Sequence, residues 1–546
     1  MAPPNIRIDA PQNGTNFNYN SSVTINVTCN DSRSGASWAF TNDSRWDADS
    51  SPPFNLTSNA PLADQPYSLK VSCNDSAGNV NYSQVYFSVF PPEQVVSCGA
   101  LGTPNRVYTL LNNVSSSGTC FTVSAQNLTI DCAGHEIDYA TSAVGYGVYS
   151  EYHNTTIKNC TIVGGSASGL GSYAIFISGA NQSTIANNVI QTNSQTAHGI
   201  QLLSASHSLV VNNSIAALGL YARGISVYSG SASNTFVNDN VTIGATSLYG
   251  IIFEKDGGSN FVSSSKVNAS NGTYYGGAGI VFCDDAAPNY VNDSTVLFSN
   301  AYGCLATCNY ASGYLYNDAI TNTAYSPGQY DVLFWMGGVN QGTLNFINTA
   351  FNKTNVHFVQ DNHFDVYWLA DTHTVDQSGS DLPGVSVSIS DVNGNLLYSG
   401  LTNSTGWLAR QTILEYEQTN DSAITNFTPH WFNASKTGRN ANNTASAVSE
   451  NHVGSNAIVR TLYLQGNVTV YLNSPPDGQW NASRNISFAY TPEAWNYGFS
   501  NATLWTNFTG VWAAGNPNAS AITNNSVNTI TVNGTPEGQF IWNVEV

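Results

Sequence analysis

The chain has 546 residues, of which 41% are hydrophobic and only 9% are charged, and its formal net charge is −19. This length corresponds to several domains, and the hydrophobic share is sufficient for packed cores. The chain holds 15 Lys and Arg in all and no basic cluster. The composition therefore argues against nucleic acid and against an anionic membrane surface as partners.

Asn-x-Ser/Thr triplets occur in every region of the chain, from Asn13 to Asn533. They are acceptor motifs for N-glycosylation, although an Asn- and Ser-rich chain also makes them by chance. No signal peptide or transmembrane run is visible, so we expect either a mature segment or a piece of a longer exported protein, without direct membrane insertion. We expect an extracellular, cell-surface glycoprotein. The acceptor candidates are Asn26, Asn55, Asn81, Asn271, Asn352, Asn433, Asn481 and Asn507.

Residues 1–93 alternate with the period of β-strands. One alternating run ends at Cys29 and another at Cys73, and Trp38 lies between them. Two cysteines on facing strands predict a β-sandwich with a Cys29–Cys73 disulfide. The segment resembles the Ig-like domains of bacterial and archaeal surface proteins.

A repeat occupies the chain from about residue 127 to residue 351. Its first phrase is a small polar residue, two β-formers and then Asn; the second is a small residue followed by Ile or Val. The central apolar residues of the first phrase, 25 to 29 residues apart, are Ile130, Ile157, Ile185, Val210, Phe236, Phe261, Tyr290, Leu315 and Leu344. The second phrase starts at Gly147, Ala174, Gly199, Gly224, Gly250 and Gly279. Two strand-like phrases at one period predict a parallel β-helix of about nine or ten rungs over residues 94–365.

Cysteines in the repeat are spaced so that they stack between rungs. Cys132 and Cys160 are one repeat apart, and so are Cys283 and Cys308. Since stacked rungs lie ~4.8 Å apart, these pairs meet the geometry of a disulfide. The remaining predicted pair, Cys98 with Cys120, lies where the chain enters the rod. Cys304–Cys308 is the alternative to Cys283–Cys308, and disulfides imply an oxidising, extracellular setting.

Asparagines follow most of the apolar positions of the first phrase by two residues. They are Asn159, Asn187, Asn212, Asn238, Asn292 and Asn317. This pattern predicts an asparagine ladder at a bend between two sheets, because Asn tolerates left-handed backbone and its amide can bond the rungs above and below. Ladder side chains would point inward, so we expect the sequons at Asn159, Asn212 and Asn292 to stay unglycosylated.

Residues 94–365 resemble right-handed parallel β-helix proteins of the NosD-like class, found in archaeal and bacterial surface proteins. The motifs that carry the resemblance are N-x-T-I-x-N and G-I-x-L/V/F at the repeat period. The resemblance implies the fold. It does not imply one function, because pectin-degrading enzymes, alginate epimerases, phage tailspikes and adhesins share this architecture.

The few charged residues of the repeat gather on neighbouring rungs. His198 and Arg223 precede successive repeat glycines, and Glu254, Lys255 and Asp256 fall one rung below Cys283, Asp284 and Asp285. Paired carboxylates beside Lys, Arg and His can serve acid–base work on an acidic sugar. The alternative, which we favour, is mutual ion pairing or a structural calcium site at Asp284 and Asp285. We therefore predict no catalytic residues, no organic cofactor and, at most, structural calcium.

The repeat stops after Asp365. Residues 366–465 resemble a carboxypeptidase-regulatory-type β-sandwich, with an Asn393-Gly394 hairpin turn, and residues 466–546 resemble another Ig-like β-sandwich. His357, His363 and His373 lie near the junction. Their spacing fits no known ligand motif, so we predict no metal there.

Two classes of function remain. The first is a non-catalytic surface glycoprotein: an adhesin, an S-layer-like or filament subunit that binds glycans, other surface proteins or copies of itself. The second is a secreted lyase or hydrolase that acts on acidic polysaccharides in a groove of the β-helix. The sequons, the flanking sandwiches and the low charge favour the first class.

Overall fold

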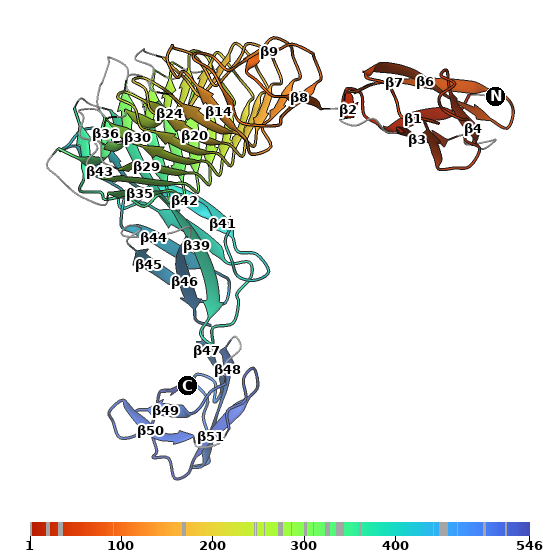
Figure 1. The fold of residues 1–546 in the computed structure, drawn as a ribbon. Coiled ribbons are helices and arrows are strands. Elements are labelled where there is room, and N and C mark those ends of the chain that lie inside the picture. Colours follow the sequence, from red (N-terminus) through yellow and green to blue (C-terminus); the bar gives the residue numbers. More distant parts are fainter. Residues whose placement is uncertain are drawn as a thin grey trace. The chain divides into compact units, whose positions relative to one another are not determined.

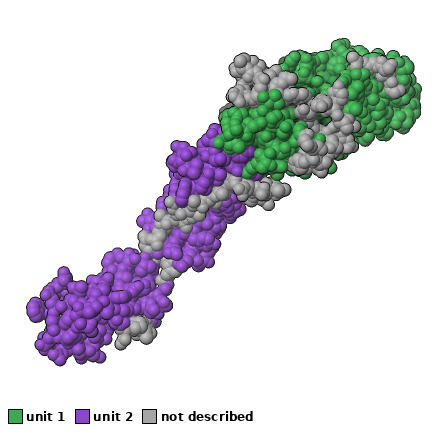
Figure 2. Space-filling view, turned by 90° about the vertical axis from the view of Figure 1, so that its left-hand side faces the viewer, with its two compact units in different colours: residues 1–365, 418–424, 453–455 green, residues 366–417, 425–452, 456–546 purple. Residues whose placement is uncertain are grey.

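β-strands are the only regular elements in the residues that the computed structural model describes. These are residues 3–17, 22–30, 36–90, 92–165, 171–244, 246, 248–255, 257–270, 277–284, 287–299, 303–308, 311–322, 328–334, 343–359, 362–439, 442–446, 457–466, 468–494, 498–518 and 521–546. They contain no helix that is long and apolar enough to cross a bilayer. Internal contacts divide the chain into two units, which Figure 2 colours separately: residues 1–365, 418–424 and 453–455, and residues 366–417, 425–452 and 456–546.

The N-terminal part of the first unit is built from one three-stranded and one four-stranded sheet, in the orders β1-β3-β5 and β2-β7-β6-β4. Buried residues of both sheets, such as Ile25 and Leu69, belong to one hydrophobic cluster. A disulfide joins Cys29 of β3 to Cys73 of β6. The strands are β1 (Asn5–Ala10), β2 (Thr15–Phe17), β3 (Thr24–Asn30), β4 (Ala36–Thr41), β5 (Phe54–Thr57), β6 (Gln65–Asp75) and β7 (Val80–Val89).

The buried tryptophan of this core is Trp46 rather than Trp38, although both lie between Cys29 and Cys73 in the sequence. Trp38 is 48% exposed, because the alternation of β4 turns Ala39 inward and Trp38 outward. Trp46 is 4% exposed and donates its indole N–H to the carbonyl oxygen of Val23 over 3.0 Å.

Three parallel sheets wind around one interior in residues 93–358 (Figure 1). The part of sheet I in this solenoid comprises β8 (Glu93–Val95), β10 (Val107–Leu110), β13 (Thr129–Asp131), β16 (Thr156–Lys158), β19 (Thr184–Ala186), β22 (Leu209–Val211), β25 (Thr235–Val237), β28 (Phe261–Ser263), β31 (Asn289–Asn292), β34 (Gly313–Tyr316) and β37 (Thr343–Ile347). Sheet II comprises β11 (Val114–Ser115), β14 (Glu136–Tyr139), β17 (Thr161–Gly164), β20 (Val189–Thr192), β23 (Ser214–Ala217), β26 (Asn240–Ile243), β29 (Lys266–Ser270), β32 (Thr295–Ser299) and β35 (Ala319–Asn322).

Sheet III has eleven described strands. They are β9 (Gly99–Leu101), β12 (Phe121–Val123), β15 (Val148–Ser150), β18 (Ile175–Ser178), β21 (Ile200–Leu203), β24 (Arg223–Tyr228), β27 (Tyr249–Glu254), β30 (Ala278–Cys283), β33 (Gly303–Cys308), β36 (Tyr330–Phe334) and β38 (Val356–Phe358). Successive turns contribute one strand to each sheet in parallel register. The predicted all-β class and parallel β-helix are confirmed.

The register confirms most of the predicted stack of apolar residues and corrects its end. Ile157, Ile185 and Val210 pair in sequence and are fully buried. The predicted Phe261 is wrong, because the partner of Phe236 is Val262. Side chains alternate between the faces of a strand, so this one-residue slip places Phe261 on the outer face, 37% exposed.

The same error recurs on later rungs. Tyr290 was predicted inside but is 39% exposed, and Val291 takes the interior position. Leu315 pairs with Phe346 rather than with the predicted Leu344, although Leu344 is also buried. The predicted period is therefore right. The predicted inward-facing residue is off by one at Phe261-Val262 and at Tyr290-Val291, where an aromatic residue precedes an aliphatic residue.

The predicted asparagines form a left-handed bend, and Asn212 donates to Asn187 Oδ1 over 3.3 Å, but the buried ladder lies one residue later. Asn187, Asn212 and Asn238 have φ between 55° and 56° and exposed side chains. These left-handed residues form the bend, and they turn the following side chain inward. The amide of Asn213 donates to Asp239 Oδ1 over 2.9 Å, and the amide of Asn188 donates to Asn213 Oδ1 over 3.0 Å.

A second buried ladder lies at the other end of the sheet I strands, and the sequence analysis missed it. Asn234 donates its amide to Asn260 Oδ1 over 3.0 Å, and Asn260 donates to Asn289 Oδ1 over 3.0 Å. All three side chains are fully buried. Side chains at both ends of sheet I thus form hydrogen bonds between neighbouring rungs in the middle of the solenoid.

The glycines of the second phrase are required by a close approach between sheets. A Cβ atom at Gly224 would lie 2.2 Å from Cγ1 of Val241, an interior residue of sheet II, and 2.5 Å from the carbonyl oxygen of Gly250. Gly250 has the same relation to Val267, at 2.3 Å. At Gly224 and Gly250 the approach of the two sheets thus leaves no room for a side chain.

Disulfides join successive turns near the N-terminal end of the solenoid. The Cα atoms are 4.6 Å apart in Cys98–Cys120 and 4.7 Å apart in Cys132–Cys160, both at predicted pairs. With the sandwich disulfide, they indicate an oxidising environment.

Cys283 is also in a disulfide. The other six paired cysteines bond among themselves, so the partner is Cys304 or Cys308. This argues against a Cys304–Cys308 bond. The strand register pairs Cys283 with Cys308, but the side chains of Cys304 and Cys308 lie outside the described residues, so Cys283–Cys308 stays a prediction.

The second unit contains a four-stranded antiparallel sheet in the order β41-β40-β44-β45, and β39 pairs with β46 in parallel. Its strands are β39 (His363–Asp376, which begins in the first unit), β40 (Ser386–Ser390), β41 (Leu396–Leu401), β42 (Gln411–Gln418), β43 (Ile424–Asn426), β44 (His430–Ser435), β45 (Asn442–Ser446) and β46 (Ile458–Leu464).

Two three-stranded sheets, β47-β48-β51 and β50-β49-β52, complete the second unit. Phe488, Tyr490, Leu504 and Val544 are buried between their strands. The strands are β47 (Val468–Ser474), β48 (Ile486–Ala494), β49 (Ala502–Thr506), β50 (Ala513–Asn518), β51 (Asn528–Val532) and β52 (Trp542–Glu545). The boundaries of the four predicted domains stay predictions.

Candidate functional site

The outer face of sheet III carries a cluster of aromatic side chains on its N-terminal rungs. Tyr149 and Phe176 are register partners on β15 and β18, and their ring centroids are 5.3 Å apart. Tyr146 and Tyr173 precede these two strands, with centroids 5.7 Å apart. Phe176 contacts both of them, at 5.2 and 5.4 Å. We call Tyr146, Tyr149, Tyr173 and Phe176 the aromatic strip.

The strip is half-buried and combines apolar rings with polar edges. The Tyr149 hydroxyl donates to the carboxylate of Glu151. Burial, and then the neighbouring Glu151 carboxylate, raise the pKa of Tyr149 to about 12, so this hydroxyl is protonated at neutral pH. Amphipathic rings of this kind offer apolar contact area and a hydrogen-bonding edge together.

His198 extends the strip on the next rung. Its ring stacks on Tyr173 with centroids 4.7 Å apart and an interplanar angle of 6°. The side chain is 8% exposed, and its Nδ1 has no hydrogen-bond partner among the described residues. Burial, and then the charge of Arg223, lower the pKa of His198 well below its usual value. The imidazole is therefore neutral at physiological pH and packs as an aromatic ring.

Arg223 and Glu254 neutralise each other at the end of this face. Nη1 of Arg223 lies 2.9 Å from Oε2 of Glu254 and 3.2 Å from Oγ of Ser226. The guanidinium also lies over the ring of Tyr249, at 5.5 Å from its centroid. Arg223 and Tyr249 are register partners on β24 and β27.

The other predicted charges lie at the end of the same strands. Glu254 pairs with Cys283 in the register, which confirms that the two charged rungs are neighbours. Lys255 and Asp284 follow the strands with φ of 52° and 56°, in the left-handed region of a bend. Asp256 and Asp285 lie outside the described residues. The catalytic roles considered for these side chains, and the calcium site at Asp284 and Asp285, stay predictions.

Towards the C-terminal rungs the outer face of sheet III changes character. Ile252, Ala278, Val281 and Leu333 are at most 3% exposed and form one apolar cluster. Ile252 and Val281 occupy the same register column as Phe176. No surface for a ligand remains at these positions.

Each histidine of the predicted junction cluster pairs with its own aspartate. His357 Nδ1 lies 2.8 Å from Asp421 and His373 Nε2 lies 2.9 Å from Asp381.

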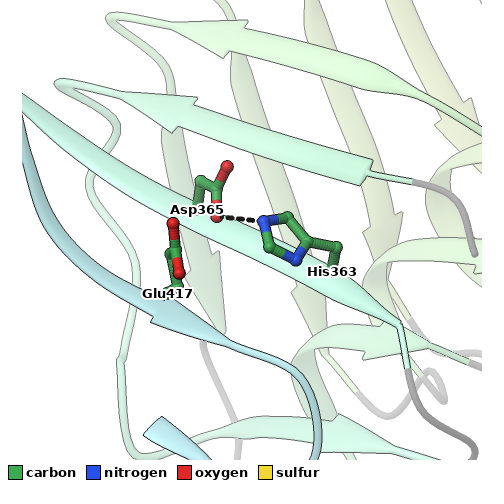
Figure 3. Close-up of side chains that lie close together, drawn as sticks. All are labelled: His363, Asp365 and Glu417. Carbon is green, nitrogen blue, oxygen red and sulfur yellow. Dashed lines mark ion pairs between the residues drawn. The ribbon is translucent and has the colours of Figure 1, made fainter. Parts of the chain in front are cut away.

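Figure 3 shows the third pair, in which Nε2 of His363 lies 2.8 Å from Oδ1 of Asp365. Ligand atoms of His363, Asp365 and Glu417 all lie within 4.8 Å of one another. One imidazole and two carboxylates are groups that a divalent cation accepts, but exposed acidic groups often gather in this way without an ion.

The sequence analysis missed the aromatic strip. Its members come from positions just before and just after the small residues of the second phrase, on rungs about one repeat apart in sequence. The available signal was the recurrence of an aromatic residue directly before the small residue, as in Tyr146-Gly147 and Tyr173-Ala174.

Comparison with known proteins supports the fold. Residues 108–273 match the family described as "Right handed beta helix region". No curated protein matches the chain.

Among solved structures, the A-module of mannuronan C-5 epimerase AlgE4 from Azotobacter vinelandii is 12% identical, with a TM-score of 0.36, over 49% of this chain and 80% of that one. An alginate lyase from Paenibacillus sp. is 15% identical, with a TM-score of 0.35, over 47% and 94%. Tailspike protein 2 of an Escherichia coli O157:H7 bacteriophage is 10% identical, with a TM-score of 0.25, over 65% and 63%. Such distant likenesses carry no argument about activity.

Proposed function

We propose that this chain is a non-catalytic, glycan-binding protein of the cell surface, and that the aromatic strip holds the glycan. The observation that carries the proposal is the strip itself, in which four aromatic side chains gather, half-buried, on one face of a rigid coil. Tyrosine and phenylalanine rings pack against the C–H faces of sugars, and the phenol edges hydrogen-bond to their hydroxyls.

The charged groups nearby support binding rather than catalysis. General acid–base work requires a titratable group that can reach the substrate with a suitable pKa. Glu254 is paired with Arg223 at 2.9 Å, and the buried His198 stays neutral because its pKa is lowered. These groups suit a binding surface with fixed hydrogen-bond partners.

A rod that binds glycan suits an adhesin, or a subunit of a surface layer or filament. Sandwich sheets at the ends of the chain have edge strands, such as β47, to which a second copy or another surface protein can add a strand. Calcium is the one ion we retain for this chain, at Asp284 and Asp285.

The binding proposal is tested by removing the rings. The full chain is screened against an array of neutral and acidic glycans, and Kd is measured for the glycan that binds. We expect Tyr149→Ala and Phe176→Ala each to weaken binding at least about tenfold, which corresponds to about 1.4 kcal/mol.

Tyr290→Ala is the matched control, because Tyr290 is a ring on the outer face of sheet I that is more exposed than the rings of the strip. Equal loss in the control and the strip variants, or glycan binding that both strip variants leave intact, would overturn the assignment. A screen in which no glycan binds would overturn the proposal as a whole.

The enzymatic alternative has a direct test. The chain is incubated with acidic polysaccharides, and release of unsaturated or reducing ends is followed. We expect no turnover. Turnover that is lost in Glu254→Gln would replace the binding proposal with catalysis at this face.

A further inference from the structure

The described strands of sheet III contain no asparagine, although the chain is rich in this residue. Sheets I and II do contain it, for example Asn289 in β31, Asn240 in β26 and Asn268 in β29. A strand without asparagine cannot accept an N-linked oligosaccharide. Sheet III is therefore the one face of the solenoid on which the described strands offer no acceptor.

The sequons between residues 113 and 292 follow the same division. Each acceptor within the described residues lies on a strand of sheet I or II, or in a connection that leads to or from one. They are Asn113, Asn127, Asn154, Asn159, Asn181, Asn212, Asn240, Asn268 and Asn292. The acceptor Asn271 lies outside the described residues. The aromatic strip is consequently bordered by potential glycans but not covered by them.

Asn240 is the acceptor with the most favourable geometry. In a strand, residues i and i+2 face the same side, so Asn240 and Thr242 both point outward from β26 while Val241 is buried. The Asn240 side chain is exposed. An oligosaccharide attached there would extend into solvent without disturbing the interior.

Other acceptors are less available because their amides hold neighbouring rungs. The amide of Asn127 is half-buried and donates to Asn105 Oδ1 over 2.5 Å, and that of Asn159 donates to Asp131 over 3.0 Å. Asn212 is exposed and donates weakly, at 3.3 Å. The Asn212 side chain is therefore not inward-facing as expected, and the absence of modification at its sequon stays a prediction.

We infer that sheet II is a glycosylated face of this protein, with an N-linked oligosaccharide at Asn240, and that sheet III is the face kept free of glycan. The inference follows from the placement of acceptors and does not require that the aromatic strip bind a ligand. If both proposals hold, sheet II is the face covered by oligosaccharide and sheet III is the face that binds the ligand.

The experiment uses the full chain, secreted from a host that glycosylates Asn-x-Ser/Thr. Release of the glycans by peptide N-glycosidase in ¹⁸O-labelled water marks each formerly occupied asparagine by its mass. We expect the Asn240 peptide to be marked in most molecules and the Asn127 peptide in few. Thr242→Ala, which keeps the acceptor but removes the sequon, should abolish the mark at Asn240 and reduce the intact mass by one glycan.

An unmarked Asn240 in a protein whose other sequons are marked would overturn the inference, and so would a protein with no marked site. Glycan-array binding by Thr242→Ala separates the two proposals. Unchanged binding is expected, because β26 lies on sheet II. An unmarked Asn240 in the unsubstituted protein that still binds glycan would refute only the glycosylated face, whereas an occupied Asn240 without any glycan binding would refute only the strip.

Discussion

The two halves of the outer face of sheet III differ although one backbone register runs through both. From β15 to β24 the outer positions hold the aromatic strip, Gln201 and Ser226, whereas from β27 to β36 they hold Ile252, Val281 and Leu333. The rings of the strip are half-buried, Gln201 and Ser226 are polar residues only 7% and 0% exposed, and the second set is an apolar cluster that is buried.

The inward-facing residues of sheet III are similar in its two halves. Ile175, Ile200, Ile225, Ile251 and Ile280 are fully buried register partners in both halves. The coil thus needs its inner positions to form, and the outer positions are free to carry either a ligand surface or a packing surface.

The largest expected effect comes from placing a carboxylate in each half. Val281→Asp buries a charge at a position 3% exposed, and we expect it to lower the free energy of unfolding by at least about 4 kcal/mol or to prevent folding. Phe176→Asp, in the same register column, should cost about 1 kcal/mol. Thermal unfolding followed by circular dichroism measures both.

Equal losses in these two variants would break the distinction between an open and a covered half. Val281→Leu is the control for crowding at the covered position, and it should keep most of the stability. If Val281→Leu is as damaging as Val281→Asp, the loss reflects packing volume rather than burial of charge.

The next effect concerns Asp239, which lies in the ladder where the two halves meet. Its Oδ2 is buried without a hydrogen-bond partner among the described residues, and burial raises its pKa to about 6. The folded state therefore holds a proton that the unfolded carboxyl, with a pKa near 3.8, releases earlier. This contribution to stability is complete below pH 3.8 and is lost as the pH rises through about 6.

Asp239→Asn should remove this pH dependence, because an amide completes the ladder without a proton. We expect the variant to gain up to about 3 kcal/mol of stability at pH 7.5 and little at pH 4. Unfolding by denaturant at both pH values measures the gain. Asp293→Asn is the control, since Asp293 is exposed at a comparable bend; a gain in the control, or an equal gain for Asp239→Asn at both pH values, contradicts the account.

The smallest effect is that of the ion pair that joins the halves. Arg223 of β24 and Glu254 of β27 are 20% and 24% exposed, so solvent screens their attraction in part. A double-mutant cycle of Arg223→Gln and Glu254→Gln should give a coupling energy of about 1 kcal/mol that decreases at high salt. A coupling of zero would mean that the two side chains contribute nothing to joining the rungs.

The sequence predicted the coil because its inner and outer positions alternate at a fixed period, and this pattern survives substitutions among Ile, Val and Phe. It could not determine the phase at Phe261-Val262, since either residue fits the period. Only the pairing of Val262 with Phe236 decides. The same holds for Asn212-Asn213, where the left-handed bend at Asn212 selects Asn213 as the buried ladder residue.

The candidate site was harder to predict for a different reason. Its rings come from separate rungs, and no short motif contains more than two of them. Glu254 and Lys255 stand out in the sequence because charged residues are scarce. The sequence does not show whether such a charged side chain already has an ion-pair partner. The pairing of Glu254 with Arg223 depends on the distance across a rung, which only the fold supplies.

The two disulfides at the start of the solenoid have a consequence for how it fails under load. A stack of coils normally unravels from its ends, one turn at a time, since each turn is held only by its neighbours. The disulfides Cys98–Cys120 and Cys132–Cys160 each close a loop of chain, and their paired cysteines are 22 and 28 residues apart in the sequence. Force on the N-terminus cannot extend these segments until a covalent bond breaks. The N-terminal, cross-linked turns therefore extend less under force than the later turns. A protease cut within either loop leaves both fragments attached to the solenoid through the disulfide.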